Sequence, residues 1–205
     1  GNFLIKQVAA ELQEELGKLK TFATLSPVPG FRPWLEANAP RLAAVGGGSA
    51  LASWVEKTKG QTGRRAVAPG EEVRELLLQL CAHYLTRERR ADGRPLDAVA
   101  RFHLRNGARL ERINWAADGS PHGLARSAGI MVNYLYEIDE VERNHQAYVN
   151  EGKITVSRRV ESLARALRWP ENHAAAQPQS ARGGDEARRP HHRAAATSAS
   201  SSSRR

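Results

Sequence analysis

The sequence has a single cysteine, no long apolar run and none of the common catalytic motifs. One cysteine, Cys81, stands among 205 residues, which excludes an internal disulfide and a multi-cysteine zinc site and is typical of a reducing compartment. No run of about 18 apolar residues occurs, so the sequence predicts no membrane span. The first residues show no charged region followed by an apolar one, so we expect no secretory signal. Gly-x-Ser-x-Gly, the Walker loop and His-Glu-x-x-His are also missing, which removes the usual motif-based enzyme assignments.

The composition is that of a basic globular protein. Hydrophobic residues make up 40% of the chain, enough to build a buried core. Lysine and arginine number 31 against 22 acidic residues, which gives a formal net charge of +9, and part of this excess lies in residues 170–205. A basic surface attracts nucleic acid, anionic lipid or phosphate-bearing small molecules, and net charge alone does not choose among them.

Hydrophobic spacing predicts an α+β fold with a small sheet. We expect helices over residues 2–16, 31–37, 50–57, 71–89, 95–106, 139–149 and 156–168, and strands over 21–25, 109–115 and 129–136. The first strand should end before Ser26-Pro27-Val28-Pro29, because proline cannot continue the pairing. Residues 38–70 are expected to form a loose insertion that is helical only at 50–57. We expect a folded domain over 1–169 and a disordered, basic Ala/Ser/Arg tail over 170–205.

Three hydroxyl-bearing residues are candidates for chemistry, and each has a structural alternative. Ser26 follows the first strand, either as a turn serine or as a hydroxyl held at the end of a sheet, where binding sites of α/β folds often lie. Tyr134 and Tyr136 alternate with Val132 on one face of the last strand. Their phenols either pack in a half-buried face or donate hydrogen bonds to a developing oxyanion.

His103 is the candidate acid or base. It falls in line with Leu96, Val99 and Ala100 on the expected inner face of its helix. A histidine there is either a satisfied core residue or a general acid or base, because the pKa of an imidazole is easily moved through neutrality. Spacing alone does not decide between these two interpretations.

Five separate motifs resemble the catalytic, C-terminal part of malonyl-CoA decarboxylase. They occur in the family's order and spacing: Phe-Leu-Ile-Lys-Gln-Val at 3–8, Leu-Ser-Pro-Val-Pro-Gly-Phe at 25–31, Phe-His-Leu-Arg-Asn-Gly-Ala at 102–108, Arg-Ile-Asn-Trp at 112–115 and Asn-Tyr-Leu-Tyr at 133–136. The resemblance extends from Gly1 to near Arg168, is poor over 38–70 and does not include the tail.

This resemblance implies the architecture of the protein. It implies a GNAT-type acetyltransferase-like fold, truncated at its N-terminus, which in the full enzyme follows a helical domain that builds a homo-oligomer. The family's loop for the pyrophosphate of coenzyme A would end at Gly1 and Asn2, where a helix begins. The free amides and positive dipole end of a helix N-terminus suit such an anion.

The resemblance also implies the reaction and its residues. Malonyl-CoA would lose carbon dioxide to give acetyl-CoA, with no metal, biotin or pyridoxal cofactor. The family's serine and histidine fall on Ser26 and His103, and an active-site tyrosine falls on Tyr136. His103 would donate a proton to the enolate with Ser26 as its partner, and Gly1, Asn2, Ser26 and His103 would contact the substrate.

Two alternatives of other classes accompany this hypothesis. A catalytically inactive CoA-binding or interaction fragment is suggested by the start of the chain at Gly1, after most of the phosphate loop. A nucleic-acid-binding protein is suggested by the arginine pairs of the tail, but the tail has no aromatic residues to stack on bases. We therefore expect neither a nucleic acid nor a membrane as partner. The Arg- and Ala-rich composition and the absence of a peroxisomal Ser-Lys-Leu terminus favour a bacterial cytoplasm.

Overall fold

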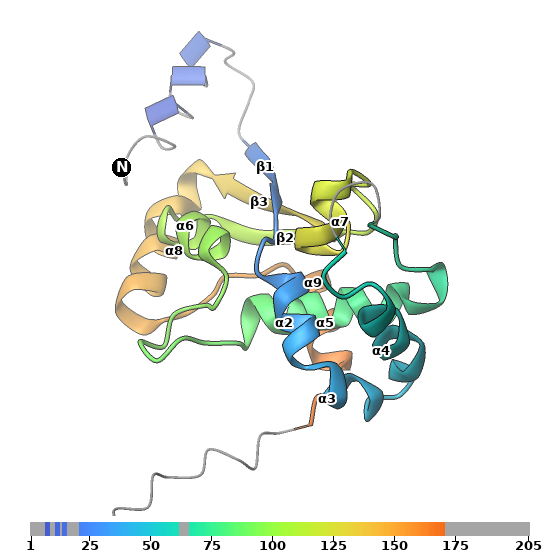
Figure 1. The fold of residues 1–205 in the computed structure, drawn as a ribbon. Helices are drawn as coiled ribbons and strands as arrows, with labels where there is room; N and C mark the ends of the chain where they lie inside the picture. The colour runs from blue at the N-terminus through green and yellow to red at the C-terminus, as the bar shows by residue number, and fades with distance from the viewer. Residues whose placement is uncertain (1–6, 9–10, 13, 16–20, 62–65, 171–205) are drawn as a thin grey trace, which may run out of the picture. The chain divides into compact units, whose positions relative to one another are not determined.

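Three strands form one antiparallel sheet in the part of the chain that the structure describes, which comprises residues 7–8, 11–12, 14–15, 21–61 and 66–170. In this computed structural model β3 (Met131–Glu137) lies between β1 (Thr21–Pro27) and β2 (Arg109–Asn114), as Figure 1 shows. Helices pack around this sheet, so the α+β fold class is confirmed. Gly1, Asn2, most of the expected first helix and nearly all of the expected tail lie outside the described residues.

The middle strand has the buried face that alternation predicted. Val132, Tyr134 and Tyr136 are buried, while the residues between them are half-buried. Successive side chains of a strand point to opposite faces, so these three lie on one side of the sheet. That side carries two tyrosine hydroxyls into the interior.

The first strand is longer than expected. β1 continues through Ser26, which pairs with Val132, and through Pro27, which pairs with Met131. The prediction that the strand ends before Ser26 is therefore wrong. β1 is an edge strand of the described sheet, and an edge strand tolerates a proline because the missing N–H can face away from the ladder. The consequence is that Ser26 is held by sheet pairing and does not belong to a turn.

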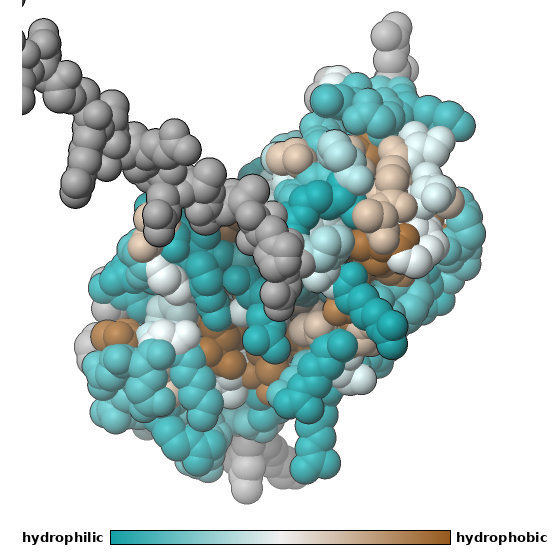
Figure 2. All heavy atoms as spheres, turned by 90° about the horizontal axis from the view of Figure 1, so that it is seen from below, coloured by the Kyte–Doolittle hydropathy of each residue, from teal (hydrophilic) through white to brown (hydrophobic). Residues whose placement is uncertain are grey.

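Helix α5 (Arg74–Thr86) forms the centre of the core beneath the sheet. Most of its side chains are buried, namely Leu76, Leu77, Leu78, Leu80, Cys81, Ala82, Tyr84 and Leu85. A short 3-10 turn, η2 (Glu71–Val73), precedes it, and α9 (Arg158–Ala166) packs against it. Seen from below, hydrophobic residues surface only in separate areas among hydrophilic ones (Figure 2).

The remaining helices connect the strands and largely follow the expected pattern. Their bounds are α2 (Phe31–Ala37), α3 (Ala39–Ala43), α4 (Gly48–Lys57), α6 (Ala98–Arg105), α7 (Pro121–Ser127) and α8 (Ile138–Glu151). Helix α2 packs against α7, and α6 against α8. Across the described ranges no helix is long and apolar enough to cross a membrane.

The segment expected to be a loose insertion is part of the core. It contains α3 as well as α4, and the side chains of Leu42, Leu51 and Val55 have no exposed surface. The buried guanidinium of Arg32 donates to the Val55 carbonyl and to the Thr58 hydroxyl (3.3 and 2.8 Å), which ties α2 to the end of α4. The expectation for 38–70 is therefore wrong, because widely spaced apolar residues find their partners only in the tertiary fold.

Helix α6 begins later than proline placement suggested. Its N-cap is Asp97, whose side chain accepts a hydrogen bond from the Ala100 amide (2.8 Å). Leu96 consequently lies outside the helix and is 39% exposed, so its expected place on the inner face is wrong. Ala100, His103 and Leu104 form that face.

Gly107 ends α6 in the left-handed region, with φ +80°, and an added Cβ there would overlap the Val141 carbonyl of α8. We expect Gly107→Ala to lower the free energy of unfolding by about 2 kcal/mol, because the backbone conformation and the contact both disfavour a side chain. Urea denaturation measures this. Gly152→Ala is the matched control, since Gly152 has φ +64° and nothing within 4 Å. An equal loss of unfolding free energy in both variants would mean that the contact with the Val141 carbonyl has no effect.

Candidate active site

Three of the predicted candidates meet in one hydrogen-bonded cluster. The Ser26 hydroxyl lies 3.0 Å from Nε2 of His103, and the Tyr136 hydroxyl lies 2.7 Å from Nδ1 of the same ring. They come from β1, α6 and β3, and 77 residues separate Ser26 from His103. All three side chains are buried. The structure therefore brings both nitrogens of the imidazole into contact with a hydroxyl.

The sheet register explains how these side chains converge. Ser26 pairs with Val132, and Tyr136 pairs with Phe22, so both lie on the buried face of the sheet but at different places along the strands. His103 lies between them, stacked on Tyr134 with ring centroids 4.2 Å apart and planes at 15°. Tyr134 is therefore a platform that positions the imidazole.

A fourth hydroxyl, which sequence reasoning missed, extends the cluster. The Ser26 hydroxyl donates to Oγ1 of Thr24 (3.2 Å), two residues earlier on the same face of β1. In the tautomer with its hydrogen on Nε2, His103 donates to Ser26, Ser26 donates to Thr24, and Nδ1 accepts from Tyr136. The signal that could have found Thr24 is its spacing of two from Ser26, had the strand been extended past Leu25.

Burial controls the charge of this cluster. It lowers the pKa of His103 from the ordinary 6.5 to about 4 and raises the pKa of Tyr136 well above its usual range. At neutral pH the imidazole is therefore uncharged and the phenol keeps its proton. This differs from a Ser-His-Asp triad, in which a carboxylate on the second nitrogen stabilises the imidazolium. In this cluster a phenol, not a carboxylate, contacts the second nitrogen of the ring.

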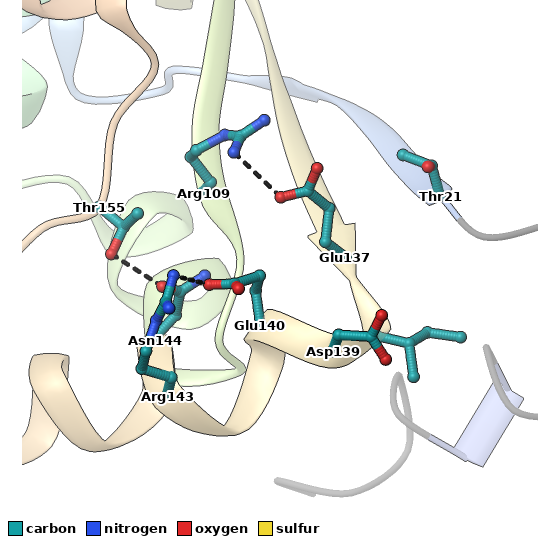
Figure 3. Close-up of a pocket in the computed structure, with 9 residues that line it drawn as sticks. Thr21, Arg109, Glu137, Asp139, Glu140, Arg143, Asn144 and Thr155 are labelled. Atoms are coloured by element: carbon teal, nitrogen blue, oxygen red, sulfur yellow. Dashed lines mark hydrogen bonds and ion pairs between the residues drawn. The ribbon is translucent and has the colours of Figure 1, made fainter.

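A separate polar cavity of about 460 Å³ lies at the far end of β3 (Figure 3). It is lined by Thr21, Arg109, Glu137, Ile138, Asp139, Glu140, Arg143, Asn144 and Thr155. Its arginines are already paired, Arg109 with Glu137 (3.0 Å) and Arg143 with Glu140. Ser26, His103 and Tyr136 do not line it, so this cavity is distinct from the hydroxyl–imidazole cluster.

Comparison with known proteins identifies the family. Residues 1–176 match the family model described as the malonyl-CoA decarboxylase C-terminal domain. The chain belongs to the malonyl-CoA decarboxylase family. The resemblance in the five motifs is thereby confirmed, and the Ser26–His103–Tyr136 cluster lies within the matched region of this decarboxylase-family chain.

Relatives of this family member are similar over most of its length. The protein named malonyl-CoA decarboxylase, mitochondrial, from Anser anser anser is 37% identical over 181 residues, which is 80% of this chain and 36% of the goose protein. The crystal structure of malonyl-CoA decarboxylase from Rhodopseudomonas palustris matches with 41% identity and a TM-score of 0.68, over 80% of this chain and 37% of that one. The enzyme from Cupriavidus metallidurans matches with 44% identity and a TM-score of 0.62, over 80% and 43%. The chain thus spans just over a third of the length of the curated relative.

Proposed function

We propose that this protein catalyses the decarboxylation of malonyl-CoA to acetyl-CoA and carbon dioxide at the cluster of Ser26, His103 and Tyr136. The observation that carries the proposal is the 3.0 Å contact between Ser26 and His103 in a chain of the malonyl-CoA decarboxylase family. Residues 77 positions apart meet there at the face of a sheet. A turn serine and an unrelated core histidine are not expected to form such a contact.

The reaction needs an electron sink and one proton. The bond between the α-carbon and the carboxylate breaks, its electron pair moves into the thioester carbonyl, and an enolate remains after carbon dioxide leaves. The α-carbon then takes a proton as the thioester is restored. The thioester itself accepts the electrons, so the protein must orient the carboxylate, stabilise the oxyanion and supply the proton. One oxyanion donor contributes about 3–4 kcal/mol, and general-acid delivery adds roughly 10²–10⁴-fold.

His103 is the proton donor in this scheme. In the resting protein its imidazole is neutral, because burial lowers its pKa to about 4. The malonyl carboxylate brings a negative charge beside Nε2, which favours the imidazolium and raises the pKa of His103 when substrate is bound. His103 therefore takes up a proton with the substrate and gives it to the α-carbon once carbon dioxide has left.

Ser26 and Tyr136 position this donor. Tyr136 contacts Nδ1 and fixes the plane of the ring, donating to Nδ1 when the ring is neutral and accepting from it when the ring is protonated. Ser26 contacts Nε2 and offers a hydroxyl to the reacting group. Stacking on Tyr134 removes the remaining freedom of the imidazole. A side chain held at three points loses little entropy in reaching a productive geometry.

The larger architecture is proposed from the family. The described sheet would be part of a GNAT-type fold, and the place of β1 at an edge of the described sheet supports this, because a further strand could pair along it. Gly1 and Asn2 would hold the pyrophosphate of the substrate at a helix start. A helical domain of the longer relatives would build a homo-oligomer. Residues 1–169 would form one domain, and residues 170–205 would follow it as a separate tail.

The cytoplasm is the compartment we propose. The matched crystal structures come from the bacteria Rhodopseudomonas palustris and Cupriavidus metallidurans, which supports a bacterial setting. The goose and rat relatives carry the word mitochondrial in their names, so a mitochondrial matrix is the other candidate. Neither nucleic acid nor a membrane is needed by the chemistry.

A second candidate function is binding of coenzyme A without turnover. The coverage of only 36% of the goose relative favours it, because a catalytic unit can require the remaining parts of a protein. Calorimetry with coenzyme A, alongside an assay of acetyl-CoA formation, separates the two. Binding without product supports this candidate, and product formation excludes it.

Ser26→Ala tests the proposed decarboxylation. We expect kcat for malonyl-CoA to fall roughly tenfold, because a hydrogen bond to a group that becomes charged is lost, while Ser26→Thr keeps a hydroxyl and part of the activity. Chromatographic measurement of acetyl-CoA gives the rate. Ser49→Ala, on an exposed position of α4, is the control and should match wild type. Unchanged turnover in Ser26→Ala would remove Ser26 from the proposed site.

A further inference from the structure

A second cavity, of about 510 Å³, opens between α6 and α8. It is lined by Arg94, Arg101, Phe102, Arg105, Asn106, His145, Tyr148 and Val149. The decarboxylation scheme uses none of these side chains. Its composition differs from that of the first cavity, because three arginines line it and no acidic residue does.

Two of the arginines are available to a ligand. Arg101 donates to the carbonyls of Pro95 and Leu96 (2.8 and 2.7 Å), which holds it in place. The guanidinium groups of Arg94 and Arg105, in contrast, have no hydrogen bond or ion pair to any other residue within the described ranges. Planar guanidinium groups bind phosphate oxygens in pairs of parallel hydrogen bonds. The charge of this cavity is therefore uncompensated and suited to a multiply charged anion.

Two buried polar atoms in the cavity wall also lack partners. The Tyr148 hydroxyl and Oδ1 of Asn106 are buried with no hydrogen bond to the described part of the chain, and the two residues are 8% and 7% exposed. A buried polar group without a partner costs roughly as much as a lost hydrogen bond, so each calls for an explanation. Arg94 and Arg101 act electrostatically on Tyr148, where they oppose the rise in its pKa that burial causes. The unpartnered groups and the arginines thus share one site.

An apolar surface stands beside these charges. Phe102 is 52% exposed and Val149 is 55% exposed, which is unusual for large hydrophobic side chains. An exposed aromatic face beside arginines offers stacking to a flat ring. A ligand that carries both a ring and phosphate groups would satisfy the two halves of the cavity together.

We propose that the cavity between α6 and α8 binds the phosphorylated end of a nucleotide, with Arg94 and Arg105 on the phosphates and the base against Phe102. This chemistry has two sources, a free nucleoside diphosphate or the base and 3′-phosphate of a coenzyme A thioester, whose pyrophosphate is assigned above to Gly1 and Asn2. The site stands independently of the proposed decarboxylation, and only the second source rests on it.

Occupancy of this cavity bears directly on the imidazole of the first site. The Phe102 ring meets the His103 ring edge-on, with centroids 5.1 Å apart. Phe102 therefore both lines the cavity and contacts the proposed proton donor. A nucleotide that orders Phe102 would also restrict His103, which Tyr134 already contacts by stacking.

Titration calorimetry with ADP tests the site. We expect binding in the wild-type protein and at least about tenfold weaker binding in the double variant Arg94→Gln/Arg105→Gln, because two charge-assisted contacts are lost. The double variant Arg158→Gln/Arg159→Gln removes the same charge from exposed positions on α9 and should bind like wild type. Since the guanidinium groups of Arg94 and Arg105 make no hydrogen bond or ion pair to another described residue, circular dichroism should show both variants folded. Lysine at both positions should restore part of the affinity.

Competition separates the two sources. If ADP still binds when coenzyme A is saturating, the site takes a free nucleotide; if coenzyme A displaces ADP and loses affinity in Arg94→Gln/Arg105→Gln, it takes the end of the thioester. Both results support the site. No ADP binding, or equal affinity in both double variants, overturns it. ADP has no thioester and cannot be decarboxylated, so this titration is separate from turnover and failure of the proposed decarboxylation would not affect it.

Discussion

Replacing His103 by asparagine is expected to lower kcat for malonyl-CoA by about 10²–10⁴-fold, the range that general-acid catalysis supplies. Asparagine retains a polar side chain in the pocket but offers no group that can be protonated and then release its proton. The loss should fall mainly on kcat, because the proton is transferred after the substrate is bound. Formation of acetyl-CoA and carbon dioxide under saturating substrate measures the effect.

Two companion variants make this result specific. Tyr136→Phe keeps the ring and removes only the hydroxyl at Nδ1, so its loss should lie between wild type and His103→Asn. His122→Asn, on an exposed position of α7, removes a histidine elsewhere and should leave kcat unchanged. If His103→Asn turned over at a near-normal rate, the imidazole would not be the proton donor and the proposed mechanism would fail.

The free energy of unfolding is expected to rise by about 3 kcal/mol between pH 4 and pH 6.5 through His103 alone. Burial lowers the pKa of His103 to about 4 in the folded protein, against an ordinary value of 6.5. Between these values the unfolded chain binds a proton at this position and the folded protein does not. Lower pH therefore favours the unfolded state across this window, and the stabilisation is complete above pH 6.5.

Denaturant unfolding at several pH values checks this dependence. The increase of the free energy of unfolding with pH should be markedly smaller in His103→Asn, because the variant has no titrating group at this position. Carboxylates elsewhere contribute equally to both proteins. His122→Asn should keep the wild-type slope. Identical slopes in wild type and His103→Asn would mean that the imidazole titrates normally in the folded protein. The substrate-dependent protonation proposed above would then lose its basis.

Several elements followed directly from local pattern. Alternation placed Val132, Tyr134 and Tyr136 on one buried face, and the structure has this face in β3. Helical spacing placed α2 at 31–37 and predicted the buried helix that became α5. These predictions succeed because strand and helix periodicity are properties of neighbouring residues. The family resemblance was also confirmed. Each of its five motifs is a contiguous run of residues, so it can be recognised in the sequence without knowledge of the fold.

Other features escaped local pattern because distant residues decide them. Pro27 argues against a strand, yet β1 includes it, since pairing with β3 extends along an edge where a missing N–H is harmless. Leu42 and Val55 have little periodic context, yet both are fully buried once α3 and α4 pack together. The hydrogen bond between Thr24 and Ser26 could not be predicted, because it depends on β1 continuing through Ser26.

The sequence alone named the chemically capable residues, Ser26, His103 and Tyr136, and left each with a structural alternative. Packing chose between them: one imidazole touches both hydroxyls because β1 and β3 pair in a fixed register and α6 lies across that face. Burial of the ring, and with it the low pKa of His103, likewise arises from neighbours on separate elements. Periodicity acts over a few residues, whereas proximity and dielectric environment belong to the assembled fold, so composition and motifs could supply the reacting groups but not their arrangement.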